Sequence, residues 1–238
     1  MNPLLAEWSG PHGGVPPFDR IAVEDFAPAL EAAMAGQLAE IEGIAQHPAA
    51  PTFDNTLAAL ERSGRSFDRA SRIFNVFRRT MSSPEFQAVE REMAPKLAAF
   101  RDRIVQNQKL FARIAAVFEM DNLPPEESRL AWLKHTEFVR SGARLGAAAK
   151  QRLSELNQQL AVLYSRFGQN VLADESGGVI PNTRSSVEPF LTYSDHREQR
   201  EKVWRSFVSR GDNGDANDNK RIVAEIVKLR AERARLLG

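Results

Sequence analysis

The chain contains 238 residues, of which 42% are hydrophobic and none is cysteine, and its formal net charge is +1 at pH 7. The lack of cysteine excludes disulfide scaffolds, cysteine-ligated metal centres and cysteine nucleophiles. No apolar run exceeds five residues, and the first residues have neither a basic nor an apolar signal region. We therefore expect no membrane-spanning helix and no secretory signal. The near-neutral charge argues against a nucleic-acid-binding protein.

Charge is distributed unevenly along the chain. Residues 1–62 carry nine acidic and two basic side chains, whereas residues 184–238 carry twelve basic and nine acidic ones. Such asymmetry can mark opposite faces of a cleft, but chance differences between solvated helix surfaces explain it more simply.

Apolar residues recur at helical spacing through the first 80 residues. After Pro16-Pro17, a stripe from Phe26 to Ile41 steps by four, four, four and three residues, which predicts an amphipathic helix that ends at His47-Pro48. A second helix is expected to begin near Thr52–Asn55, which are good capping residues, and to run to Phe77 with Gly64 as a candidate interruption.

Three further helices are expected before residue 175. Ser83-Pro84-Glu85 is a strong helix start because it supplies a capping hydroxyl, a proline at the first helical position and an early acid. The polar residues 106–109 predict a bend or short break. Pro124-Pro125 opens the next helix, and the most regular stripe of the chain runs from Leu153 to Val171.

The periodicity stops at residues 175–182, the only stretch with linker character. Beyond it, Asp195 and Glu198 are spaced as a capping box for a helix with Val203, Trp204 and Phe207. A turn at 211–215 then precedes a last helix from about Asp218 to Leu237.

These patterns predict an all-α fold, a multi-helix array of mostly antiparallel amphipathic helices. We expect an N-terminal helical region over residues 1–175, a short linker or join over 176–181, and a C-terminal helical segment over 182–238 that packs on the first region.

No catalytic, cofactor-binding or metal-binding residues are predicted within this chain. The four histidines, His12, His47, His135 and His196, are scattered, and the two H-x-E pairs at His135 and His196 place their side chains on opposite sides of a helix. No H-E-x-x-H motif occurs. We interpret His135 as a partly buried histidine and His196 as a helix-start histidine.

Other kinds of site fail on their spacing. A calcium loop that starts at Asp215 would place Lys220 where glycine is required and Ile226 where a bidentate acid is required. No phosphate-binding glycine motif and no G-x-S-x-G elbow occur, and Ser185-Ser186 has no nearby histidine. The basic last helix has oppositely charged residues three or four positions apart and no interleaved aromatics, which favours a solvated face over nucleic-acid binding.

Several blocks, in order, resemble one enzyme family. Residues 17–30, 51–64 and 153–171 are similar to the N-terminal blocks of the thimet-oligopeptidase family of zinc metallopeptidases, and residues 200–204, 215–219 and 230–238 resemble its peptidyl-dipeptidase, or dipeptidyl carboxypeptidase, branch. In that family the zinc motif lies in a C-terminal catalytic half. The resemblance implies that this chain is the non-catalytic N-terminal lid and channel wall of a cytoplasmic enzyme that removes C-terminal dipeptides from short peptides.

The resemblance also implies partners for this chain, and the chain differs from the family at one connection. Zinc is expected in the catalytic half, and that half is the expected partner; nucleic acid and membrane are not. The family has a longer connection than Ser176–Pro181, for which a natural deletion, an engineered join or an omitted loop would each account. A stand-alone helical protein-interaction module is the alternative function.

The last helix carries more apolar residues than one packing face needs. Ile222, Ile226 and Leu229 share one side, whereas Val223 and Val227 lie on another. We therefore expect self-association through this helix or fraying of its end.

Overall fold

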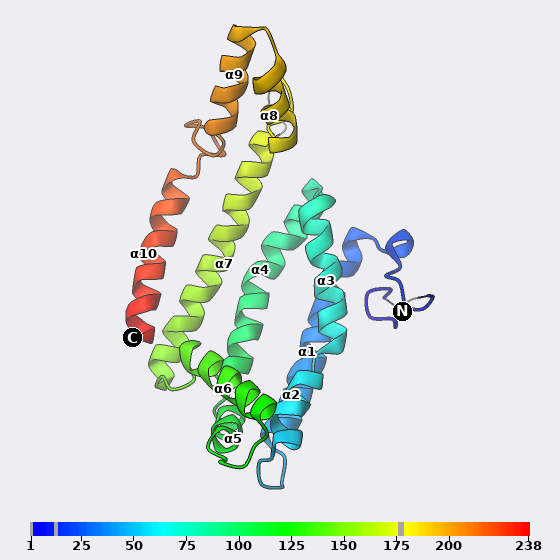
Figure 1. Ribbon diagram of the computed structural model, residues 1–238, viewed down its shortest axis with the longest axis vertical. Coiled ribbons are helices and arrows are strands. Elements are labelled where there is room, and N and C mark those ends of the chain that lie inside the picture. Colours follow the sequence, from blue (N-terminus) through cyan, green and yellow to red (C-terminus); the bar gives the residue numbers. More distant parts are fainter. Residues whose placement is uncertain (1, 12–13, 176–178) are drawn as a thin grey trace. The chain divides into compact units, whose positions relative to one another are not determined.

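The chain folds into helices joined by short loops (Figure 1). The computed structural model describes residues 2–11, 14–175 and 179–238. Within these ranges no strand occurs, and the only pairing of that kind is an isolated bridge between Ser9 and Val15. The predicted all-α class is therefore confirmed. Of the four scattered histidines, His12 lies outside the described residues.

The chain divides into two compact units. The first unit comprises Met1–Gln158 with Leu236–Gly238, and the second comprises Gln159–Arg235. The predicted linker at 176–181 falls within the second unit, and its residues 176–178 lie outside the described part of the chain. The predicted boundary, and the packing of 182–238 on the first region, therefore stay predictions.

The first unit contains α1 (Phe26–Ala45), a π-helical turn (Phe53–Ala58), α2 (Ala59–Arg62), α3 (Arg65–Thr80), α4 (Pro84–Val105), α5 (Gln108–Phe118), α6 (Pro125–Arg140) and the start of α7 (Ala147–Glu175). Several predicted boundaries are confirmed. Ser83 Oγ accepts a hydrogen bond from Phe86 N at 3.2 Å, α4 ends just before the polar residues 106–109, and the predicted second helix is interrupted at Gly64.

The interruption at Gly64 has a backbone cause. Gly64 has φ +77°, a left-handed conformation in which glycine is tolerated and other residues are strained. Its N–H donates to Glu40 Oε2 at 2.7 Å, and a Cβ at this position would collide with the Gln37 side chain. The chain therefore turns between α2 and α3 while its backbone lies directly against α1.

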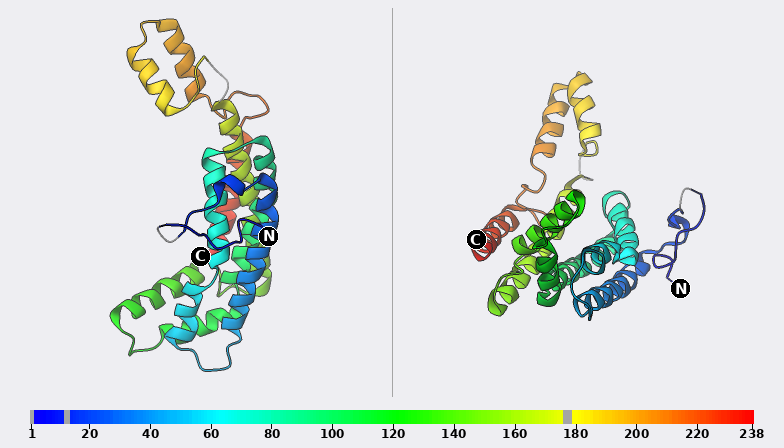
Figure 2. Two further views of the ribbon diagram at one scale, coloured as in Figure 1. Left: turned by 90° about the vertical axis from the view of Figure 1, so that its right-hand side faces the viewer. Right: turned by 60° about the horizontal axis from the view of Figure 1, so that its bottom comes forward.

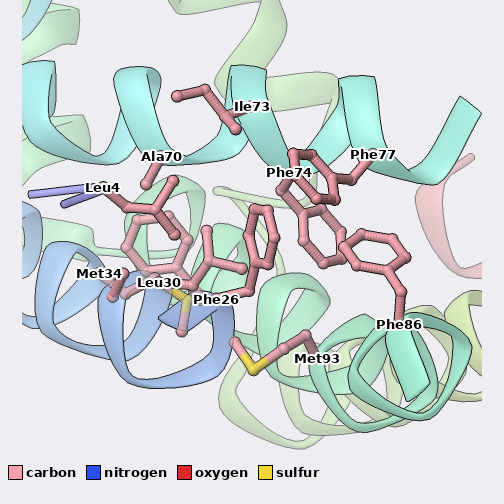
Figure 3. Packing of buried hydrophobic residues seen from close by; sticks show 12 residues of the cluster. Leu4, Phe26, Leu30, Met34, Ala70, Ile73, Phe74, Phe77, Phe86 and Met93 are labelled. Atoms are coloured by element: carbon pink, nitrogen blue, oxygen red, sulfur yellow. The ribbon is translucent and has the colours of Figure 1, made fainter. Parts of the chain in front are cut away.

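Helix α1 contributes to two hydrophobic cores. Its N-terminal half packs with α3 and α4 around Phe26, which is fully buried, and its C-terminal half packs Ile41 and Ile44 with the π-helical turn, α5 and α6. Figure 3 shows the first core, where the Phe26 ring lies 4.8 Å from Phe77 and 5.2 Å from Phe86, centroid to centroid, in edge-to-face arrangements. Such pairs add to the hydrophobic stabilisation.

The loop after α1 is held by a buried arginine. Arg113, from α5, donates to the carbonyl oxygens of His47 and Ala49, both at 3.1 Å, and to Asn55 Oδ1 at 2.7 Å. Asn55 Oδ1 also accepts from Thr52 N at 2.8 Å, so one amide joins the helix cap to the buried guanidinium. These bonds pair the buried guanidinium with oxygen atoms of the exposed loop and so fix the loop against α5.

The second unit contains the rest of α7, α8 (Arg184–Tyr193), α9 (Arg197–Val208) and α10 (Lys220–Leu237) up to Arg235. Helices α8 and α9 form a hairpin, seen as the gold and orange pair in both views of Figure 2. The predicted capping box of α9 is wrong. Its N-cap is His196, which places Asp195 one residue too early to cap the helix.

A cavity-forming substitution tests the first core. Replacing the fully buried Phe86 with alanine is expected to lower the free energy of unfolding by about 3–5 kcal/mol, because it removes a ring that contacts Phe26, Phe74 and Phe77. Urea denaturation followed by circular dichroism measures the change. The control Met81→Ala, at an exposed position, should change it by less than about 0.5 kcal/mol. A similar loss for both variants would contradict this packing.

Candidate docking surface

The described histidines do not assemble into a metal site. His47 follows α1, and its Nδ1 accepts a hydrogen bond from Ala49 N at 3.2 Å. His135 lies in α6 between aromatic rings, and His196 is the exposed N-cap of α9. Within the described ranges no three histidine, aspartate or glutamate side chains gather to hold a metal ion. The residues present thus do not fit the zinc of the family, and the lack of a site stays a prediction.

His135 is stacked against two phenylalanines. Its ring lies 4.3 Å from Phe118 and 5.5 Å from Phe111, centroid to centroid, and Arg144 Nη2 is 3.4 Å from its Nε2. Burial of the ring lowers the pKa of His135 below its usual value; the Arg144 charge lowers it further, and Glu119 acts in the opposite direction. The partly buried histidine expected from the sequence therefore packs between aromatic rings.

The stacked histidine predicts a pH dependence of stability. Because the pKa of His135 is lower in the folded than in the unfolded chain, its contribution to the free energy of unfolding is complete above the usual histidine pKa, about 6.5, and is lost as the pH falls toward the folded value. His135→Phe should flatten this fall while keeping an aromatic ring in the stack. His196→Gln, at an exposed position, should leave it unchanged; an equal effect of both variants would refute the assignment.

Polar groups between α4 and the start of α7 serve to join these helices. A hollow of about 690 Å³ there is lined by alanines of α1 and α4 and by Asp102, Gln106 and Ser154. Asp102 Oδ1 accepts from Asn157 Nδ2 at 2.8 Å, and Lys150 Nζ donates to the carbonyl oxygen of Gln106, at the C-terminal end of α4, at 3.1 Å. A cation at this end of a helix stabilises it, so these groups have a structural role.

The second unit leaves much of its apolar surface uncovered. Among the described residues of the first unit, 26 hydrophobic side chains are buried and seven large ones are exposed, whereas the second unit buries six and exposes nine. The exposed apolar surface of the second unit consists of these residues: Val162, Tyr164, Phe167, Val179, Tyr193, Trp204, Val208, Val223 and Val227. Exposed apolar groups mark a docking site where they adjoin one another.

The apolar stripe of α7 changes its surroundings along the helix. Leu153, Leu156 and Leu160 are buried, but Phe167, on the same stripe, is 38% exposed. Trp204, which the sequence places among the apolar residues of α9, is 51% exposed, while its neighbour Val203 is buried. The helical spacing of apolar residues in the sequence places these residues on the apolar faces of α7 and α9. It carries no information on which other helix covers each face.

Helix α10 has the two apolar sides expected from its sequence. Ile222, Ile226 and Leu229 are buried, whereas Val223 is 44% and Val227 61% exposed. Leu236 and Leu237 at its end are half-buried. The inner side therefore packs within the protein, and the outer side is open to a further partner.

A carboxylate that sequence reasoning missed anchors the loop between α9 and α10. Asp174, on α7, accepts hydrogen bonds from Gly211 N at 2.8 Å and Asn213 Nδ2 at 2.9 Å. One turn earlier, Asn170 Nδ2 donates to the buried Asn219 Oδ1 at 2.9 Å. The available signal was the four-residue spacing of Asn170 and Asp174 on a helix with an apolar stripe, since that spacing places both on one face.

Several known proteins are similar in sequence to this chain over its whole length. No protein-family model matches the chain. Dipeptidyl carboxypeptidase of Escherichia coli is 32% identical over 275 residues, which cover 100% of this chain and 40% of that protein. The enzyme of the same name from Salmonella typhimurium is 32% identical with the same coverage, and the probable cytosolic oligopeptidase A of Arabidopsis thaliana is 25% identical over 100% of this chain and 39% of its own length.

These matches relate the chain to the thimet-oligopeptidase family of metallopeptidases, as its sequence blocks predict. Within the family, the identity to the dipeptidyl carboxypeptidases exceeds that to the Arabidopsis oligopeptidase A. The chain spans about 40% of the length of the curated relatives it matches. In the described residues no helix has the length and apolar character needed to cross a bilayer.

Charge on the outer side of α10 tests the docking surface. We expect the isolated chain to self-associate through this open apolar side, and the double variant Val223→Glu, Val227→Glu to reduce that association in light scattering because it places charges there. The free energy of unfolding should change by less than about 0.5 kcal/mol, since both positions are exposed. The matched variant Ile222→Glu, on the buried side, should instead destabilise the fold. Unchanged association of the double variant would exclude this surface.

Proposed function

We propose that this chain is the non-catalytic N-terminal helical region of a peptidyl-dipeptidase-like zinc metallopeptidase. The whole enzyme would cleave C-terminal dipeptides from short peptides in the cytoplasm, with zinc held by its catalytic half. The role of this region is to enclose the substrate and to select it by size. The observation that carries the proposal is that the entire chain is similar to part of the dipeptidyl carboxypeptidases, which are much longer than the chain.

The uncovered apolar surface of the second unit supports this proposal. In a longer polypeptide the catalytic half can cover Trp204, Val223 and Val227. Burying these side chains would stabilise the protein by roughly 25 cal/mol for each Å² of apolar surface removed from water. A helical region that belongs to a larger protein needs no complete core of its own.

The length of the matched region gives a second argument. The comparison with the Escherichia coli enzyme extends over 275 residues and includes all 238 residues of this chain. That enzyme therefore carries residues within the matched region that this chain lacks. We propose that the difference lies at residues 176–181, where the family connection is longer; a natural deletion, an engineered join or an omitted loop would each account for it.

A stand-alone helical protein-interaction module is the second candidate, and the exposed Tyr193 and Trp204 favour it. Aromatic side chains of this kind are enriched in protein interfaces. The two proposals differ in the encoded polypeptide: an open reading frame that continues past Gly238 into an H-E-x-x-H motif supports the peptidase, and a frame that ends there supports the module.

Peptide cleavage tests the proposed role directly. The isolated chain, incubated with zinc and a blocked oligopeptide, should release no dipeptide and should retain no stoichiometric zinc after dialysis, because its described side chains form no ligand set. The polypeptide of the full reading frame should release C-terminal dipeptides in a chelator-sensitive manner. Chelator-sensitive cleavage by the isolated chain would overturn the non-catalytic assignment.

A further inference from the structure

The Asp174 carboxylate accepts several of the hydrogen bonds that hold the loop Gly211–Asn219 on α7. Asp174 Oδ2 accepts hydrogen bonds from Gly211 N at 2.8 Å and from Asn213 Nδ2 at 2.9 Å, and its Oδ1 accepts from Asn217 Nδ2 at 3.2 Å. All three donors are neutral amide groups, and each donates an N–H to the carboxylate. An ionised carboxylate can accept hydrogen bonds but cannot donate them. One of these three bonds therefore depends on Asn213 remaining an amide.

Asn213 is followed by glycine, and both residues are exposed. Gly214 has φ +70°, and a Cβ on it would meet no atom within 4 Å, so the space beside its Cα is open. A backbone nitrogen next in sequence can attack the side-chain carbonyl of an asparagine, and a glycine nitrogen does so with the least steric hindrance. Asparagine is accordingly among the thermally labile residues.

The Gly214 N–H already faces a carboxylate. It donates to Asp218 Oδ2 at 2.8 Å. The Lys220 hydrogen bond lowers the pKa of Asp218 to about 2, so this oxygen is ionised throughout the neutral range and is a weak base. Hydroxide must therefore remove the proton, and an attack by this nitrogen accelerates as the pH rises.

We propose that Asn213 is a site of spontaneous deamidation, and that its conversion to a carboxylate releases the loop from α7. The Gly214 nitrogen bonds to Cγ of Asn213 and its proton passes to hydroxide; the bond from Cγ to the side-chain nitrogen then breaks, and that nitrogen takes a proton from water and leaves as ammonia, which regenerates hydroxide. Water opens the resulting succinimide at either carbonyl and gives aspartate or isoaspartate. The net reaction converts amide and water into acid and ammonia, with no oxidation or reduction. The inference does not depend on the proposed function.

The product changes the contact with α7 from attractive to repulsive. A carboxylate at position 213 no longer donates to Asp174, and two like charges near hydrogen-bond distance repel. The same loop carries Asn219, whose N–H donates to the Gly211 carbonyl at 2.7 Å and whose Oδ1 accepts from Asn170. Loss of the Asn213 bond therefore loosens the connection between α9 and α10.

The loop contains its own control. Asn217 donates to the same carboxylate, but it precedes Asp218, whose side chain hinders attack by the backbone nitrogen. Asn213 and Asn217 share one loop and one acceptor and differ in the residue that follows. Asn213 should therefore lose its amide first.

Mass spectrometry tests the chemistry. The full chain is incubated in mildly alkaline buffer and digested, and the peptides containing Asn213 and Asn217 are followed by mass and by isoaspartate-specific methylation. Conversion is expected at Asn213 before Asn217, faster at higher pH, and absent at this position in the Asn213→Gln variant. An Asn213 amide that survives as long as that of Asn217 would overturn the proposal.

Hydrogen exchange tests the consequence. Asn213→Ala removes the donor alone, whereas Asn213→Asp also adds the charge. The N–H groups of Gly211 and Asn219 should exchange about tenfold faster in the Asp variant than in the Ala variant, and added salt should reduce this difference. Equal exchange in the two variants would refute release by repulsion, even if deamidation occurs.

Discussion

The need to cover apolar surface organises this chain, and α1 satisfies it for the first unit. The helix buries Phe26 and Leu30 against α3 and α4 at one end, and Ile41 and Ile44 against α5 and α6 at the other. Both cores share this helix. The short loops and caps around α1 therefore serve to fix the positions of the elements that pack on it. Arg113 does so for the loop after α1 through neutral oxygen atoms.

The second unit meets the same requirement differently. Polar anchors, such as Asp174 and the Asn170–Asn219 pair, hold its loop in place, while large apolar groups are exposed. Hydrogen bonds of this kind fix geometry but add little net stability, so apolar contacts must come from elsewhere. Under the proposed function, the catalytic half would supply those contacts; the chain spans about 40% of the length of the dipeptidyl carboxypeptidases it matches.

The sequence predicts local structure well where the signal is local. Ser83-Pro84 and Thr52–Asn55 act within one turn of helix, and both starts are found near the expected positions. Tertiary context could not be predicted in this way. Phe167 and Trp204 have ordinary core periodicity and are exposed, and the anchors Asp174 and Arg113 join residues that lie 37 to 66 positions apart. The predicted lack of a catalytic site followed from missing motifs and the family resemblance.

Hydrogen exchange across α10 and α4 tests the central claim most directly. If the second unit depends on a missing partner, backbone amides of residues 220–235 in the isolated chain should exchange much faster than those of α4, because fewer apolar contacts oppose their opening. A monomeric chain in which α10 is as well protected as α4 would contradict the account and would favour a self-sufficient helical module.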